Sequence, residues 1–232
     1  SVCVLCVVVY ISEEERSEKE RLVMPVRWIV HILCISIGCM LGAREMTFDE
    51  TAVTALACRE GLVQARFTNY IERCASQSTN VEMALTANLL RGFSRIASFD
   101  LMADESHLAA TWCAITNVAQ MPVMTPDRWQ YWHLQILKAF YFNTMGDEQS
   151  AYLVASNAWD DIQVRGVVDS TNAVSRALLG FEELGEGATL REAMALSRAL
   201  TAAAIGRTND VNEVKPILSD RLRQKMEDFL RD

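Results

Sequence analysis

The chain has 232 residues, half of them hydrophobic, and a formal net charge of −8 at pH 7. A negative protein repels phosphate backbones, so this charge disfavours nucleic-acid binding. Ten glycines and four prolines are few for an all-β protein of this length. The seven cysteines have no regular spacing and therefore predict no disulfide framework.

Residues 1–23 contain none of the ten methionines and join an apolar stretch to a charged run. We expect them to be a non-native or disordered extension. From Met24 a short basic start precedes sixteen mostly apolar residues, Trp28 to Ala43, which is the pattern of a secretory signal. A helix of that length spans about 24 Å, less than the ~30 Å hydrocarbon core of a bilayer. We therefore predict a signal peptide or membrane anchor at 24–43, an α-helical repeat domain at 44–232, and an exported, periplasmic or membrane-associated protein.

The segment Ser36-Ile37-Gly38-Cys39 resembles the lipid-attachment box of bacterial lipoproteins, in which a small residue precedes the cysteine that receives the lipid. The resemblance implies that Cys39 is a lipid attachment site. Three outcomes stay open for this segment: lipidation, cleavage without a lipid, and an apolar helix that is retained as an anchor or buried in the fold.

Beyond residue 43 the sequence predicts amphipathic helices joined by short turns. Thr47-x-x-Glu50 is a capping box at the start of an apolar stripe with helical period, which continues to residue 74. Gly61 lies inside the stripe and is expected to bend or split the helix. No segment alternates polar and apolar residues at period two, so we expect no strands.

The following helices are predicted from the residues that start them. Thr79-x-x-Glu82 indicates a capped helix that ends near residue 99, and Asp104 opens one that ends near residue 120. Thr125 as N-cap with Pro126 at the first helical position predicts another helix, to residue 143.

The last part of the chain continues the same pattern. A turn at Gly146 precedes a helix, and a further helix is expected to open at residue 169 or 170. Thr189-x-x-Glu192 caps a helix with an alanine-rich face, which permits close helix packing. Pro216 is expected to begin a final amphipathic helix that caps the C-terminal end of the array.

One short phrase occurs three times, as Phe99-x-x-Met102-Ala103-Asp104, Phe142-x-x-Met145-Gly146-Asp147 and Phe181-x-x-Leu184-Gly185-Glu186. The copies are spaced by roughly 40 residues, and self-similarity at such a period predicts stacked supersecondary units. Each unit is expected to be an antiparallel helical hairpin. The three phenylalanines are predicted to be buried near the end of the first helix, with the small residue in the turn.

Phe142, Gly146, Ala151 and Ala158 have the relative spacing of the second half of a tetratricopeptide repeat. In that family these positions hold the bulky residue of the first helix, the turn glycine and the two small residues where the helices touch. Residues 80–205 therefore resemble tetratricopeptide repeats. The resemblance implies an all-α fold in which antiparallel hairpins stack as a right-handed array, with the final helix as its cap.

A shorter resemblance covers residues 135–167. The sequences Gly146-Asp-Glu-Gln-Ser-Ala151-Tyr and Val164-Arg-Gly166-Val are similar to the middle region of fungal zinc-cluster transcription factors. This resemblance implies a regulatory domain. The six-cysteine DNA-binding module of those proteins does not occur in the sequence.

The most concentrated aromatic group is Trp129-Gln-Tyr131-Trp132-His133. On a helix, Trp129 and Trp132 fall on one face and Tyr131 on another. Two interpretations stay open. The tryptophans fill the space between neighbouring hairpins, or Trp129, Tyr131 and Trp132 contact a ligand or peptide, because large aromatic side chains dominate interface energetics.

No catalytic or metal site is predicted. The three histidines are far apart in the sequence, and no G-x-S-x-G, phosphate-loop or H-E-x-x-H pattern occurs. The acidic pairs Asp147-Glu148 and Asp160-Asp161 are typical of solvated helix starts and faces. We therefore expect no enzyme activity and no cofactor.

These observations predict an exported or membrane-tethered helical-repeat scaffold that binds a protein or peptide partner and no nucleic acid. The first alternative is a helical protein that encloses a small apolar ligand, which a closed cavity lined by Met, Trp and Phe would favour. The second is the regulatory domain that the fungal resemblance implies.

Overall fold

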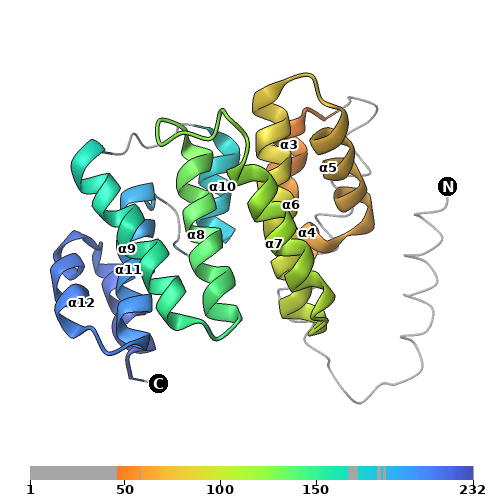
Figure 1. Cartoon of the computed structure of the whole chain (residues 1–232). Coiled ribbons are helices and arrows are strands. Elements are labelled where there is room, and N and C mark those ends of the chain that lie inside the picture. Colours follow the sequence, from red (N-terminus) through yellow and green to blue (C-terminus); the bar gives the residue numbers. More distant parts are fainter. Residues whose placement is uncertain (1–45, 58, 167–171, 182–183, 185–186, 232) are drawn as a thin grey trace, which may run out of the picture. The chain divides into compact units, whose positions relative to one another are not determined.

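The structure, a computed structural model, describes residues 46–57, 59–166, 172–181, 184 and 187–231 (Figure 1). The contacts divide the chain into residues 1–45 and residues 46–232, and every described residue belongs to the second unit. The predicted extension, the signal or anchor and Cys39 therefore lie outside the described residues. The described part forms eleven α-helices, one 3-10 helix and no strand, which confirms the all-α prediction. None of these helices combines the length and the apolar character needed to cross a bilayer.

Three short helices, α3 (Phe48–Leu56), α4 (Arg59–Val63) and α5 (Ala65–Gln77), take the place of the first predicted apolar stripe. The capping box is present, because Thr47 Oγ1 accepts from the Glu50 N–H and the Glu50 carboxylate accepts from the Thr47 N–H. The predicted stripe is split, but the predicted place is wrong: the breaks come after Leu56 and at Gln64, and Gly61 lies inside α4. A Cβ atom at this position would lie 2.4 Å from the Ala55 carbonyl oxygen, so only glycine lets α4 approach α3 this closely.

The next hairpin pairs α6 (Val81–Met102) with α7 (Ser106–Ala119). The predicted N-cap Thr79 is wrong. The cap is Asn80, whose side-chain oxygen accepts from the Met83 N–H at 3.2 Å. The helix also extends to Met102, beyond its predicted end, because the chain leaves it only where Ala103 adopts a left-handed conformation with φ 52°.

The second hairpin pairs α8 (Trp129–Thr144) with α9 (Glu148–Arg165). The predicted helix start at Thr125 and Pro126 is wrong, since these residues lie in turns and Arg128 is the N-cap. The turn at Gly146 is confirmed. This glycine has φ +74°, and the Asp147 carboxylate accepts from the Ser150 N–H at 3.0 Å to start α9.

The C-terminal part contains α10 (Ala173–Phe181), α11 (Leu190–Ala204), α12 (Thr208–Val214), a 3-10 helix (Lys215–Ile217) and α13 (Asp220–Phe229). The capping box of Thr189 and Glu192 is present at the start of α11. The prediction that Pro216 begins the last helix is wrong. Pro216 belongs to the 3-10 helix, and Ser219 is the N-cap of α13. Residues 169 and 170, predicted to open a helix, lie outside the described residues.

The first two copies of the repeated phrase have similar turns, because Ala103 and Gly146 both adopt left-handed backbone and the following aspartates both accept from a helix N–H. The predicted burial of the phenylalanines is wrong for Phe99 and Phe142, which are half-buried. Phe142 contacts the Trp112 ring instead of a closed core, with 5.5 Å between centroids. The side chain of Phe181 is outside the described residues.

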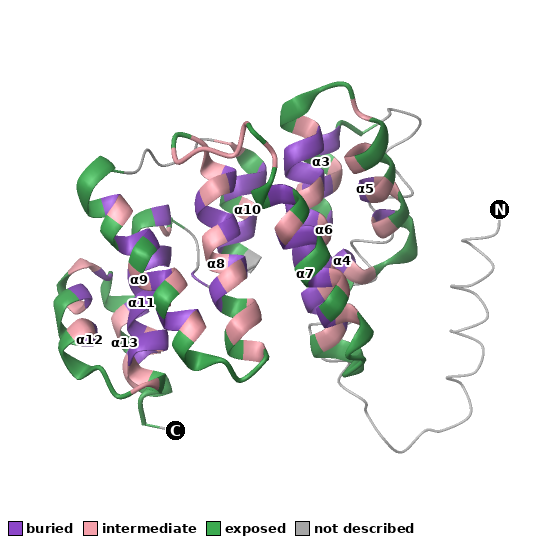
Figure 2. Cartoon of the chain, in the orientation of Figure 1, coloured by how far each residue is buried: buried purple, intermediate pink, exposed green. Residues whose placement is uncertain are grey.

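Buried residues, purple in Figure 2, line the inner faces of the helices, and their side chains form two clusters. The first joins α3 to α7 with parts of α8 and α10, and the second joins α8 and α9 with the helices that follow. Helix α8 supplies Leu134 and Leu137 to the first cluster and Trp132 to the second, so it links the two. Helix α10 packs against both α8 and α3. The contact with α3 is a departure from a solenoid in which each repeat touches only its neighbours.

Candidate functional site

The aromatic group predicted as a contact platform lies in the first half of α8. Trp132 is 2% exposed and packs in the second cluster. Tyr131 is half-buried, packs edge-on against Trp132 and donates its hydroxyl to Asp161 Oδ2 on α9 at 3.2 Å. Trp129 is half-buried and packs edge-on against His133. Tyr131 and Trp132 thus contact each other, Trp129 contacts His133, and the Trp132 ring lies in the core.

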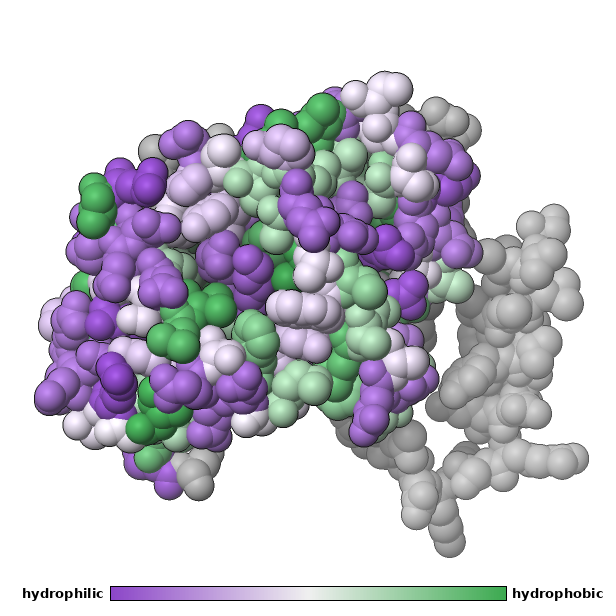
Figure 3. Space-filling model, viewed as in Figure 1, coloured by the Kyte–Doolittle hydropathy of each residue, from purple (hydrophilic) through white to green (hydrophobic). Residues whose placement is uncertain are grey.

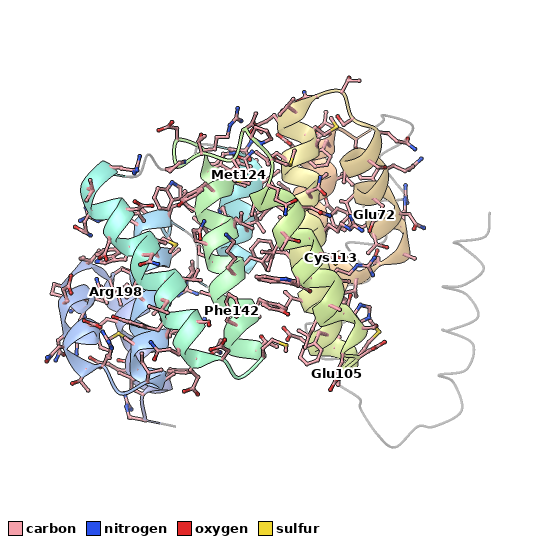
Figure 4. All side chains as sticks on the ribbon, in the orientation of Figure 1. Glu72, Glu105, Cys113, Met124, Phe142 and Arg198 are labelled. Carbon is pink, nitrogen blue, oxygen red and sulfur yellow. The ribbon has the colours of Figure 1, made fainter. Side chains whose placement is uncertain are left out.

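A second aromatic group lies at the other end of α8, where α8 packs beside α7. Trp112 of α7 contacts Tyr141 and Phe142 of α8, with ring centroids 5.2 Å and 5.5 Å apart, and the two α8 rings are 5.6 Å from each other. Trp112 is 38% exposed, while Tyr141 and Phe142 are half-buried. Figure 4 labels Phe142 on α8 and the exposed Cys113 on α7, on either side of the space between these helices. We call Trp112, Tyr141 and Phe142 the aromatic surface.

The helices that carry the aromatic surface have almost no charge. Lys138 is the only Asp, Glu, Lys or Arg residue in α7 and α8, which are 14 and 16 residues long. In Figure 3, white and green side chains lie over this region, with hydrophilic side chains around them. Protein interfaces have this composition, since their centres are depleted of charge and enriched in aromatic residues.

Lys138 and Tyr141 have shifted pKa values on this surface. Burial lowers the pKa of the Lys138 ammonium, and none of the described residues forms an ion pair with it. Burial, and then the neighbouring Cys113 thiol, raise the pKa of the Tyr141 hydroxyl. Lys138 precedes Tyr141 and Phe142 by three and four residues, which places the ammonium on their face of the helix. A partly desolvated cation beside three aromatic rings suits a carboxylate with an apolar neighbour.

A cavity of about 300 Å³ lies between α6, α8, α11 and α13. Its deep wall is formed by Phe93, Ile96, Ala139, Ala193 and Leu196, all at most 4% exposed. Asp100, Asn143 and Lys225 bring polar groups to its rim. Its volume is at the lower end of the range for small-molecule sites, and its mostly apolar lining is typical of them.

The pair with the geometry of a nucleophile and its base is His133 with Ser175, whose Nε2 and Oγ atoms are 3.1 Å apart. Neither residue is more than 1% exposed, so no substrate reaches the pair. It joins α8 to α10 within the core. Catalysis at such a pair requires access to the hydroxyl. In the part of the chain that the structure describes, no three His, Cys, Asp or Glu side chains are placed to hold a metal ion.

Arg198 on α11 is 6% exposed and lies at the centre of a polar cluster. Its guanidinium donates to both carboxylate oxygens of Glu213, at 3.2 Å and 3.0 Å, and lies 3.5 Å from Asp210. The Tyr152 hydroxyl donates to Asp210 at 2.7 Å and accepts from Arg207 at 3.0 Å. The cluster ties α9 and α11 to α12. The Arg198 guanidinium is paired with two carboxylates, although its buried Nε atom has no hydrogen-bond partner among the described residues. Because the charges offset each other, we interpret the cluster as structural.

Comparison with known proteins adds no assignment: no protein-family model, no curated protein sequence and no solved structure matches the chain. Sequence reasoning selected the aromatic group at 129–132 and missed the aromatic surface. Two signals were present in the sequence. One is the run Phe140-Tyr141-Phe142, and the other is the near absence of charge in the two segments that form α7 and α8. Neither showed that Trp112 meets this run, because that contact depends on how the hairpins pack.

Proposed function

We propose that this protein is a non-catalytic helical scaffold that binds a protein or peptide partner through the aromatic surface. The observation that carries the proposal is the cluster of Trp112, Tyr141 and Phe142, partly exposed on two helices that have a single charged side chain. Trp and Tyr are the residues most enriched among interface hot spots. A surface with this composition loses little when a partner displaces its water.

The chemistry of the surface favours a particular partner segment. Three adjacent rings accept a large aliphatic or aromatic side chain, and Lys138 offers a cation on the same face of α8. A carboxylate that pairs with Lys138 would stabilise the charged form of an ammonium that burial destabilises. The partner segment is therefore an apolar residue with an acidic residue nearby.

The proposal includes an architecture and a location. The hairpins α6–α7 and α8–α9, with their similar turns, are interpreted as successive units of a right-handed array similar to tetratricopeptide repeats. Residues 24–43 are interpreted as the segment that exports the protein or tethers it to a membrane. The intact mass of the mature protein from its own cells tests this location, because lipidated Cys39, cleavage without a lipid and a retained anchor each give a different mass. A retained segment in a protein that fractionates away from membranes would contradict it.

Selection from a random-peptide phage library tests partner binding. Enriched peptides are expected to share a large apolar residue next to Asp or Glu. In fluorescence anisotropy titrations, Trp112→Ala and Phe142→Ala should each weaken binding roughly tenfold or more, as hot-spot truncations do. Lys138→Gln should weaken it less and reduce its dependence on salt.

Leu153→Ala is the matched control, because Leu153 is an apolar residue on the neighbouring helix α9 that is 49% exposed and outside the aromatic surface. Its affinity for the selected peptides should equal that of the unmodified protein. If Leu153→Ala and Trp112→Ala lost the same amount of peptide affinity, the assignment of the binding site to the aromatic surface would be contradicted. Failure of the library to yield any saturable peptide would contradict the function.

A further inference from the structure

We propose that the cavity between α6, α8, α11 and α13 is a second binding site, for a small uncharged apolar molecule that carries one hydrogen-bonding group. The site is separate from the aromatic surface, and the proposal goes beyond partner binding. Around α8, the cavity residues Ile136, Ala139 and Asn143 occupy a different helix face from Lys138 and Phe142.

The cavity lies where the two core clusters meet. Phe93 and Ile96 on its wall belong to the first cluster, whereas Leu184, Ala193 and Leu196 belong to the second. Helix α8 lies between them and contributes Ala139, a side chain too small to fill the space. Ligand sites occur preferentially at such junctions between packed units and between helices of bundles.

The cavity is half open to solvent and is large enough for a small ligand. A space of about 300 Å³ corresponds to roughly ten waters at their volume in the liquid. The deep wall is made of side chains that form no hydrogen bonds, so water there is poorly held and an apolar ligand displaces it favourably.

Two observations indicate that the ligand has a hydrogen-bonding group and carries no charge. The Ser197 hydroxyl lines the cavity and forms no hydrogen bond with the described residues, whereas the Thr201 hydroxyl donates to the Ser197 carbonyl oxygen at 2.8 Å. A ligand N–H or O–H can therefore pair with Ser197. The rim carries one carboxylate, Asp100, and one ammonium, Lys225, so its formal charge is zero. In a chain with a net charge of −8, an organic anion gains nothing from this rim.

The mouth is apolar as well. Phe140 and Phe229 both line the cavity and are 43% and 54% exposed. Phe229 is the last residue of α13, and Phe140 lies near the end of α8. Large apolar side chains on the surface are favoured where a ligand covers them.

Two fluorescent probes with the same ring system test the ligand class in the full-length protein. N-phenyl-1-naphthylamine is uncharged, apolar and has one N–H, while 8-anilinonaphthalene-1-sulfonate adds a negative sulfonate to the same skeleton. We expect the uncharged probe to bind saturably, one per chain, with enhanced emission, and to raise the melting temperature. The sulfonate should bind roughly tenfold more weakly or worse, which is a difference of about 1.4 kcal/mol.

Variants locate the probe. Ala193→Phe adds a ring to the deep wall, and Ser197→Leu removes the hydroxyl and narrows the space, so each should reduce the affinity for the uncharged probe by roughly tenfold or more. Thermal melts followed by circular dichroism establish that each variant is folded, and either folded variant suffices for the test. Ala204→Phe is the control on the same helix, since Ala204 is exposed and does not line the cavity. Trp112→Ala is the control for the aromatic surface.

The outcomes that overturn the proposal are distinct. Absence of saturable binding by the unmodified protein, or unchanged affinity in a folded Ala193→Phe or Ser197→Leu variant, overturns the cavity site. Loss of probe binding in Trp112→Ala assigns the probe to the aromatic surface and also overturns it. Equal affinities for the two probes overturn the preference for an uncharged ligand. Failure of the peptide selection leaves each of these results unaffected.

Discussion

At the scale of single residues, small side chains set how closely the helices pack. Ala151 and Ala155 of α9 have no exposed surface. Gly92 of α6 has a similar role, because a Cβ atom there would lie 2.6 Å from Cδ2 of Leu137 on α8. A larger residue at Gly92 would require the Leu137 side chain to shift, and one at Ala151 or Ala155 would have to fit inside the core. The stability of the fold therefore depends on the absence of atoms at a few sites, as much as on the contacts that large residues make.

Ala151→Leu should lower the free energy of unfolding by about 1–3 kcal/mol, because the added atoms force neighbouring helices apart. Gln163→Leu on the same helix is the control, since Gln163 is exposed and the substitution leaves the packing unchanged. Urea unfolding followed by circular dichroism measures both. An unchanged midpoint for Ala151→Leu would mean that the N-terminal end of α9 does not pack as the structure shows.

At the scale of helices, end caps determine where the elements start and how they connect. The Glu192 carboxylate accepts from the Thr189 N–H at 3.1 Å within its own helix and from the Ser219 N–H at 3.0 Å at the start of α13. Burial acts to raise the pKa of Glu192, but these hydrogen bonds outweigh it and hold the pKa below its usual value. One side chain thus caps α11 and positions the last helix.

Because the pKa of Glu192 is lower in the folded protein than in the unfolded chain, its ionised form stabilises the fold above the usual glutamate pKa. That stabilisation is lost as the pH falls through the lower folded value. Glu192→Gln should therefore cost about 1 kcal/mol at neutral pH. The difference from the unmodified protein should shrink in acid, below about pH 4.

Urea unfolding over a series of pH values measures this effect. Glu148→Gln is the matched control, since Glu148 lies in the first turn of α9, is exposed and accepts no side-chain hydrogen bond from the described residues. At neutral pH, Glu148→Gln should lower the free energy of unfolding less than Glu192→Gln does. A Glu192→Gln penalty that stays constant from neutral to acid pH would show that the charge of Glu192 plays no part.

The helix starts show how far the sequence could predict the structure. The capping boxes that begin at Thr47 and Thr189 could be predicted because each depends only on two residues three positions apart in the sequence. The prediction of Thr79 as the N-cap of α6 failed because the neighbouring Asn80 makes an equally good local hydrogen bond. Which of the two residues caps the helix depends on the path of the incoming chain. The site was harder to predict than the helices, since Trp112 and Phe142 come together only through packing between hairpins.

At the scale of the whole helical unit, α8 and α10 connect parts that are distant in sequence. Helix α8 contributes to both core clusters, and α10 reaches back to pack against α3. The periodicity of the sequence predicted hairpins and neighbour-to-neighbour packing, but it contains no signal for the α3–α10 contact. Such a contact closes a long loop of chain, so it is specified by surface complementarity instead of local pattern.

The two core clusters that the structure describes are built from residues between Phe48 and Met226, and a signal peptide or anchor adds nothing to the mature fold. A chain that begins at Glu45 should therefore be soluble and melt within about 2 °C of the full-length protein, a change of less than ~1 kcal/mol for a domain of this size.

Removal of residues 220–232 is the control. It deletes α13, whose Leu222 and Met226 are each 1% exposed in the second cluster, and it should lower the melting temperature clearly. Aggregation or early melting of the chain from Glu45 would instead indicate that residues 28–43 pack as an integral helix, with Trp28 and Ile32 in the core. That result would also count against the proposed export or tethering segment, because a signal peptide contributes nothing to the mature fold.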